Sequence, residues 1–156
     1  LNCFWQHHGS LLMINIFLYT PFLLQALCMF FDEFYFHRKR GLGLWEKIGH
    51  PLDTLTVITC YLFIYFTDYS MNNVLIFSSL AFFSSLFVTK DEIVHSELCE
   101  PKENWLHAIL FILHPITFLC AGIIWHAEGK ENLFILAQII ILFIVLIYQI
   151  LYLRIK

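Results

Sequence analysis

The chain has 156 residues, of which 60% are hydrophobic and 13% are charged, and its formal net charge is −3. Roughly a quarter of the residues are charged in ordinary soluble domains, so this composition excludes a soluble protein and predicts a single helical domain inside the lipid bilayer. The sequence has no GxSxG, Walker, GxGxxG or HExxH motif and no basic groove with interleaved aromatic residues. Nucleic acid is therefore not an expected partner.

Residues 1–12 show neither helical periodicity nor ligands that converge with others, and we expect them to be a non-native or disordered extension. Residues 13–156 are expected to form one transmembrane helical domain. The first apolar run, residues 11–31, is long enough to cross about 30 Å of hydrocarbon. Pro21 lies inside this run and favours a kink.

Four further spans are expected, at about residues 52–67, 73–89, 104–126 and 133–153. His50-Pro51 opens the second span, where a proline in the first turn removes no helical hydrogen bond. The preceding segment, LGLWEKIGH, mixes Leu and Trp with charges and is typical of a stretch at the headgroup level. The expected fold is an all-α bundle of five transmembrane helices.

Basic residues are distributed unevenly over the two sides of this five-span arrangement. One side receives Lys130 alone, and the other receives Arg38, Lys39, Arg40, Lys47, Lys90, Lys102, Arg154 and Lys156. The positive-inside rule then predicts an outside N-terminus and a cytoplasmic C-terminus.

Carboxylates and imidazoles concentrate in two polar stretches, residues 32–53 and 90–107. The predicted topology brings four helix ends from these stretches together in a polar site at the cytoplasmic edge. The pairs Glu33–His37, Glu92–His95 and Glu103–His107 are spaced by three or four residues, so that each pair shares one face of a helix. Ionisable groups near hydrocarbon are costly and tend to be functional.

This convergence predicts a metal site. The candidate ligands are Glu33, His37, His50, Asp53, Glu92, His95, His107 and His114. Glu33 and Glu92 are the candidates to bridge two ions, whereas Asp32 and Asp91 are expected to orient ligands or face solvent. Mixed imidazole and carboxylate ligands suit iron, zinc, manganese or nickel. The ligands exceed the needs of one tetrahedral ion, so two ions are expected, with iron the first choice and zinc the second. Two alternatives to a metal site remain, namely a structural polar network and a path for protons or ions.

The run DEFYFHRKRGL, the segment IGHPLDT and the run TKDEIVHSE resemble a family of small uncharacterised bacterial integral-membrane proteins with DExxxH, GHPLD and DExVH motifs. The resemblance covers roughly residues 30–115 and implies a place in the bacterial inner membrane. The ligand types are also similar, in part, to those of membrane di-iron oxidases and hydroxylases. The HxxxH and HxxHH boxes of that class are missing here.

The function expected from these patterns is a dinuclear, di-iron-like oxidoreductase that acts on a lipid or other apolar substrate, with a redox partner. The alternatives are a zinc-dependent membrane hydrolase and a non-enzymatic metal ion transporter or metal-handling protein. The second, third and fifth spans are almost wholly apolar away from the site, which counts against a transporter.

Overall fold

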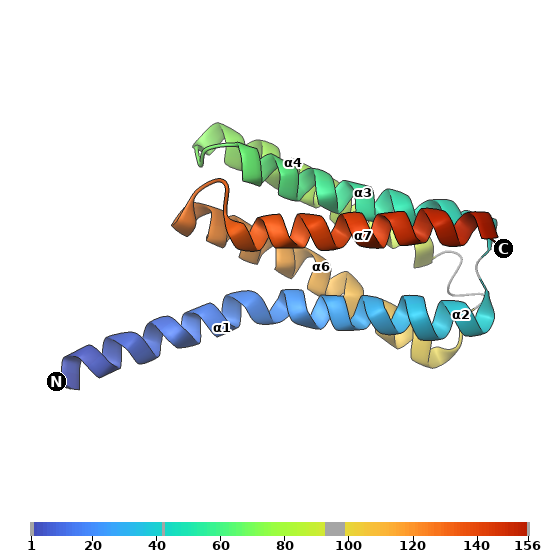
Figure 1. The fold of residues 1–156 in the computed structure, drawn as a ribbon, viewed down its shortest axis with the longest axis horizontal. Helices are drawn as coiled ribbons and strands as arrows, with labels where there is room; N and C mark the ends of the chain where they lie inside the picture. The colour runs from blue at the N-terminus through green and yellow to red at the C-terminus, as the bar shows by residue number, and fades with distance from the viewer. Residues whose placement is uncertain (1, 42, 93–98, 156) are drawn as a thin grey trace.

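The computed structural model describes residues 2–41, 43–92 and 99–155, and for residues 2–15, 40, 91 and 152–155 the description is of the backbone. Within these ranges the chain forms helices and no strands. Figure 1 shows the long helices lying along one common axis with alternating direction. The prediction of an all-helical chain is confirmed.

Five long helices run from one end of the bundle to the other. α1 (Asn2–Phe31) continues through a π-helical segment, η1 (Asp32–Phe36), into the short α2 (His37–Arg40). The chain then forms α3 (Leu44–Phe66), α4 (Met71–Val88) with the 3-10 turn η2 (Thr89–Asp91), α6 (Pro101–Glu128) and α7 (Leu133–Ile155). We call the end that holds η1, α2 and the first turns of α3 and α6 the site end, and the opposite end, with the α3–α4 and α6–α7 turns, the far end (Figure 1).

Four helical segments are long and apolar enough to cross a bilayer, namely Ile16–Lys39, Met71–Val88, Pro101–Glu128 and Leu133–Leu151. Their outer faces expose many large apolar side chains, as is usual where lipid rather than water surrounds a bundle. α3 does not belong to these four, because Glu46, Lys47, His50 and Asp53 make its first half polar. Four of the five expected spans are thus present as helices long and apolar enough to cross a bilayer, and the fifth stays a prediction.

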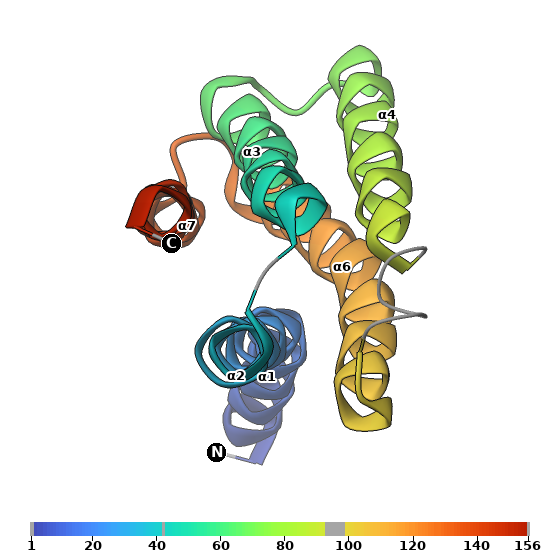
Figure 2. The same ribbon diagram turned by 90° about the vertical axis from the view of Figure 1, so that its right-hand side faces the viewer.

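α3 is the central helix of the bundle. It packs against α4, α6 and α7, whereas α1 packs mainly on α6. The end-on view in Figure 2 shows α3 between α4 and α7, with α6 crossing beneath it. The close approach of α4 to α6 depends on Gly122, because a Cβ atom there would lie 3.3 Å from the ring of Phe77.

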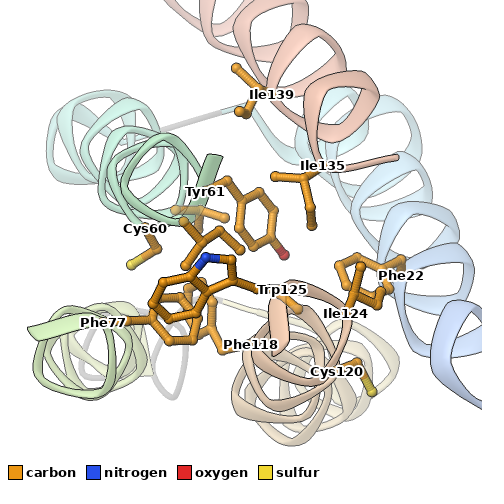
Figure 3. Close-up of a cluster of buried hydrophobic side chains, with 13 residues drawn as sticks. Phe22, Cys60, Tyr61, Phe77, Phe118, Cys120, Ile124, Trp125, Ile135 and Ile139 are labelled. Atoms are coloured by element: carbon orange, nitrogen blue, oxygen red, sulfur yellow. The ribbon is translucent and has the colours of Figure 1, made fainter. Parts of the chain in front are cut away.

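The apolar core fills the far half of the bundle (Figure 3). Each of the long helices contributes to it, for example Phe22 from α1, Tyr61 from α3, Phe77 from α4, Trp125 from α6 and Ile135 from α7. Side chains of this size at close contact gain dispersion energy that lipid tails cannot supply as well. Packing therefore holds the far half together, while polar contacts dominate the site end.

Two hydrogen bonds to backbone carbonyls close the far end. The indole Nε1 of Trp125 donates to the carbonyl of Thr67 at 2.9 Å. The backbone N–H of Glu131 donates to the carbonyl of Tyr65, also at 2.9 Å. They satisfy carbonyl groups at the end of α3, where a helix has no partners of its own. As a result, the last turn of α3 is joined to the α6–α7 hairpin.

Turn residues begin and end these helices in the expected ways. Gly129 follows α6 with a φ of 79°, a conformation that glycine adopts without strain. Ser70 precedes α4 and accepts a hydrogen bond from the backbone N–H of Asn73. Asn132 does the same for the first turn of α7. Polar residues thus form most of the turns that join α3 to α4 and α6 to α7.

Candidate metal centre

The first side chains of the site come from a local change in helix geometry. Residues Asp32–Phe36 form a π-helix, in which the backbone N–H of His37 donates to the carbonyl of Asp32, five residues earlier. Because this hydrogen bond closes a wider turn than an α-helical one, the residues four and five positions before His37 can both lie beside its ring. Those residues are Glu33 and Asp32. The wide turn thus brings two carboxylates to one imidazole.

The ring of His37 is completely buried between these carboxylates. Its Nδ1 atom lies 3.1 Å from Oε2 of Glu33, and its Nε2 atom lies 3.4 Å from Oδ2 of Asp32. The first contact is a hydrogen bond, but Nε2 has no hydrogen-bond partner among the residues that the structure describes. A buried nitrogen of this kind costs free energy unless another group satisfies it. A cation fits that requirement.

α6 supplies a second carboxylate–histidine pair to the same place. Glu103 and His107 lie one turn apart, with exposed fractions of 2% and 3%. Nε2 of His107 is 2.9 Å from Oδ1 of Asp32, which joins α6 to η1. Asp32, His37, Glu103 and His107 each offer one ligand atom, and these atoms lie within 4.8 Å of one another. This buried group, which we call the four-ligand group, could hold a metal ion.

A second group shares His37 with the first. It consists of Glu33, His37 and His50, whose candidate ligand atoms again lie within 4.8 Å of one another. His50 comes from the second turn of α3, and its ring centroid lies 4.7 Å from that of His37. We call this set the three-ligand group. Together the two groups join α1, α3 and α6 at the site end.

The other predicted ligands are distributed differently. Both carboxylate oxygens of Asp53 accept hydrogen bonds from Nζ of Lys90 at 2.7 Å, a contact that joins α3 to η2 at the end of α4. The side chain of Glu92 is exposed. His95 lies outside the described residues. His114 lies deeper in the bundle than His107, as the spacing of seven predicts. Whether any of these residues binds metal stays a prediction.

His114 is the centre of a hydrogen-bond network inside the bundle. Its Nδ1 atom is 3.2 Å from Nε2 of Gln25, and its Nε2 atom is 3.1 Å from Oγ of Ser84. The hydroxyl of Thr117 donates to Oε1 of Gln25 at 2.7 Å, and Oγ of Ser84 is 2.7 Å from Oγ1 of Thr56. Both ring nitrogens of His114 are thus satisfied by protein groups. The network joins α1, α3, α4 and α6 in the middle of the bundle.

A cavity of about 450 Å³ connects these two polar regions. It lies between α1, α3, α6 and α7, and its volume is within the usual range for small-molecule sites. Charged and imidazole side chains line its site end, namely Asp32, Glu33, His50, Asp53 and His107. Apolar side chains dominate the rest, among them Met29, Phe30, Val57, Leu110, Phe111, Ile141 and Leu142. The cavity is therefore amphipathic.

Exposed ion pairs flank the bundle at both ends. Nζ of Lys39 is 2.9 Å from Oε1 of Glu100, and this hydrogen bond lowers the pKa of Glu100. At the far end Nζ of Lys130 is 2.9 Å from Oδ2 of Asp68, and the hydrogen bond raises the pKa of Lys130. Solvent-exposed pairs of this type contribute little to stability. They bear on the orientation of the loops rather than on the chemistry of the site.

No protein-family model matches the sequence, and no curated protein or solved structure is significantly similar to it. The resemblance to small bacterial membrane proteins, with the DExxxH, GHPLD and DExVH motifs, therefore stays an expectation. What the site can do follows from its own geometry.

Two members of the groups fall outside the candidate ligands predicted from sequence. In an α-helix Asp32 would point away from His37, and only the π-helix turns it inward. Glu103 could have been predicted as a ligand from the sequence, because its spacing of four from His107 equals that of Glu33 from His37. A third carboxylate, Glu46, is completely buried in the first turn of α3 and accepts a hydrogen bond from the N–H of Gly43 at 2.8 Å.

Proposed function

We propose that this protein is a membrane-embedded, metal-dependent enzyme that acts on a lipid or other apolar substrate. One observation carries the proposal: buried carboxylates and imidazoles lie at one end of a cavity whose remaining walls are largely apolar. Converging ionisable groups beside an apolar pocket are the usual features of an active site. In a bundle with this much apolar surface, they are too costly to be incidental.

The two groups support a centre of two ions. The four-ligand group uses Asp32, Glu103 and His107 with His37, and the three-ligand group uses Glu33 and His50 with the same histidine, which would serve both ions only as an imidazolate with one ring nitrogen on each. A site with four protein ligands is closed, whereas one with three keeps a position for water or substrate. Glu33 and His50 line the cavity. The open position would therefore face the substrate.

Iron is the first choice of metal and oxidoreduction the first choice of reaction. Three carboxylates and three imidazoles form the two groups together, and such a mixture suits iron as well as zinc. A bound pair of ions would supply charge stabilisation and, if the metal is iron, electrons for dioxygen chemistry. The protein would bind the substrate, exclude water from the cavity and hold the ligands in place. A redox partner would deliver electrons at the site end.

A zinc-dependent hydrolase is the second candidate, and the ligand count favours it. A closed group of four beside an open group of three matches the division between structural and catalytic zinc sites. A transporter fits less well, because the polar side chains stop at the network around His114. Beyond it lies the apolar core of Phe118, Ile124 and Trp125, among others.

We further propose that α3 crosses the bilayer as the fifth span. It has 23 residues, and it lies between two helices that are apolar enough to span, α4 and α7. Its polar first half would face the site rather than lipid. By the positive-inside rule, the basic residues of the site end favour a cytoplasmic position for that end. The inner membrane of a bacterium is the proposed location.

Elemental analysis of detergent-purified protein tests this function. We expect two ions per chain, with iron for the oxidoreductase and zinc alone for the hydrolase. The Asp32→Asn variant should lose most of the metal, because it removes a charged ligand and keeps the shape of the side chain. Asp68→Asn, at an exposed far-end position, is the matched control and should bind as much metal as the unaltered chain. Purified protein without stoichiometric metal, even after reconstitution with iron or zinc, would contradict the proposal.

A further inference from the structure

The cavity extends a long way along the bundle axis. On α1 and η1 its lining runs from Phe22 to Phe34, and on α7 from Gln138 to Gln149. On α7, eleven residues of helix correspond to roughly 16 Å at 1.5 Å per residue. The hydrocarbon core of a bilayer is about 30 Å thick. The cavity therefore matches one leaflet in length, measured from the site end.

α7 contacts η1 near the site end and α1 deeper in the bundle, with a space between the two contacts. Near the site end the rings of Phe34 and Tyr148 lie 5.0 Å apart, and deeper in the bundle those of Phe22 and Phe134 lie 4.9 Å apart. The backbones of α1 and α7 are not closely packed, because α1 packs mainly on α6 and α7 on α3. We call the space between the two ring pairs the α1–α7 opening.

The side chains at this opening belong both to the cavity and to the outer surface. Phe30 of α1 lines the cavity and is 57% exposed, and Ile144 of α7 lines it and is 63% exposed. Ala26 also lines the cavity and is exposed, and its small side chain leaves room beside it. In a membrane these positions would contact lipid chains. The cavity can thus be reached sideways from the hydrocarbon region.

We propose that the occupant of this cavity is a single-chain lipid with an oxygen-containing headgroup, such as a long-chain carboxylic acid, which enters through the α1–α7 opening. This proposal deepens the proposed function and rests on it for the role of the headgroup. The volume of about 450 Å³ lies near the lower end of the range for ligand sites, which favours one chain over the two of a bilayer phospholipid.

The lining fixes the direction of the bound lipid. The ionisable side chains Asp32, Glu33, Asp53, His50 and His107 all lie at the site end of the cavity. The headgroup lies there, beside Glu33 and His50, where the three-ligand group is one ligand short of a closed site. The alkyl chain lies along Met29, Val57 and Leu142 toward Phe22. This direction leaves the headgroup at the depth it already has in the membrane.

A photoreactive probe tests the proposal. The full-length protein in nanodiscs is irradiated with a long-chain carboxylic acid that carries a diazirine in its chain, and adducts are located by mass spectrometry. We expect adducts on cavity-lining residues, above all Ala26, Met29 and Phe30 on α1 and Ile141, Leu142, Ile144 and Val145 on α7. The variant Ala26→Trp should reduce these adducts about tenfold, the effect of a loss of about 1.4 kcal/mol in binding. Its matched control is Ala137→Trp, which adds the same indole at an exposed α7 position outside the cavity lining.

Each outcome of this experiment supports or contradicts a stated proposal. Adducts spread evenly over lipid-facing residues, such as Leu75 and Ile112, would mean adventitious contact with the probe only and would overturn the proposal. Cavity adducts that Ala137→Trp removes as strongly as Ala26→Trp would contradict entry at the α1–α7 opening. Metal content is measured in the same samples. Bound metal without cavity adducts would overturn the lipid proposal alone. Cavity adducts in a protein that binds no metal would overturn the proposed enzyme function and support the lipid proposal.

Discussion

At the scale of single residues, the burial of His37 among carboxylates makes the site costly in free energy. An imidazole with no exposed surface, placed beside Asp32 and Glu33, lies among charges that are expensive to remove from water unless they are paired. The basic side chains nearest in sequence, Arg38 and Lys39, are exposed, so among the described residues the imidazoles of His37 and His107 are the cations within reach of these carboxylates. The proposed metal ion would pair with the carboxylates in their place.

The first prediction concerns one ligand on α6. His107→Ala should lower bound metal to about half or less, because it removes one of the four ligands and the partner of Asp32. His126→Ala is the control, since this histidine lies at the far end of α6 against Tyr69 and should leave the metal content unchanged. The measurement is elemental analysis after gel filtration. We expect His95→Ala to lower bound metal as His107→Ala does. Full metal occupancy in both variants would contradict a metal site and leave a structural polar network as the explanation.

At the scale of the element, the π-helix decides which residues meet. In an α-helix, Glu33 would lie beside His37 and Asp32 would point away from it. Deletion of Tyr35 should convert η1 to α-helical geometry and rotate the carboxylates relative to His37. Bound metal should then fall to half or less, while Tyr35→Ala, which keeps the number of residues, should retain it. Far-ultraviolet circular dichroism would verify that both variants remain helical; a deletion variant with full metal would show that the wide turn is dispensable.

The hydrogen-bond network inside the bundle makes a separate prediction about stability. Gln25→Leu removes the bonds to His114 and Thr117 and should lower the free energy of unfolding by about 1–2 kcal/mol. Gln138→Leu is matched in chemistry, but the Gln138 amide makes no hydrogen bond within the described part of the chain, so little change is expected. Unfolding in mixed detergent micelles measures both. Equal effects of the two substitutions would contradict the role assigned to the network.

Helical periodicity explains how much of this site could be predicted. It correctly pairs Glu33 with His37 and Glu103 with His107, because residues four apart share a helix face wherever the helix lies. It could not foresee that Asp53 pairs with Lys90, since that contact joins separate helices, nor that a π-helix turns Asp32 inward. The all-helical fold followed from composition alone. Whether α3 crosses the bilayer could not be predicted from composition, because its polar and apolar halves average to an intermediate hydropathy.

On the scale of the whole molecule, the two ends differ in charge. Arg38, Lys39 and Lys47 lie at the site end, and Lys130 lies at the far end. We predict that a cysteine at position 39 is protected from an impermeant thiol reagent in intact cells, whereas one at position 130 is labelled, after the native cysteines have been replaced. Labelling after the cells are opened is the control for access. The reverse pattern would invert the topology.

The polar first half of α3 has a consequence for how the chain is made. During synthesis α3 leaves the ribosome before its neighbours, with the Asp53 carboxylate made ahead of Lys90 and with a hydropathy below that of the other long helices. Lys90, which neutralises Asp53, and Gln149, which accepts a hydrogen bond from Thr54 at 2.9 Å, are translated later. The translocon would therefore meet a segment that cannot partition into lipid by itself at low cost. α3 would become a stable span only once α4 and α7 have arrived, so in a ribosome-bound chain truncated before α7 a cysteine placed in the first half of α3 should stay accessible to a water-soluble thiol reagent.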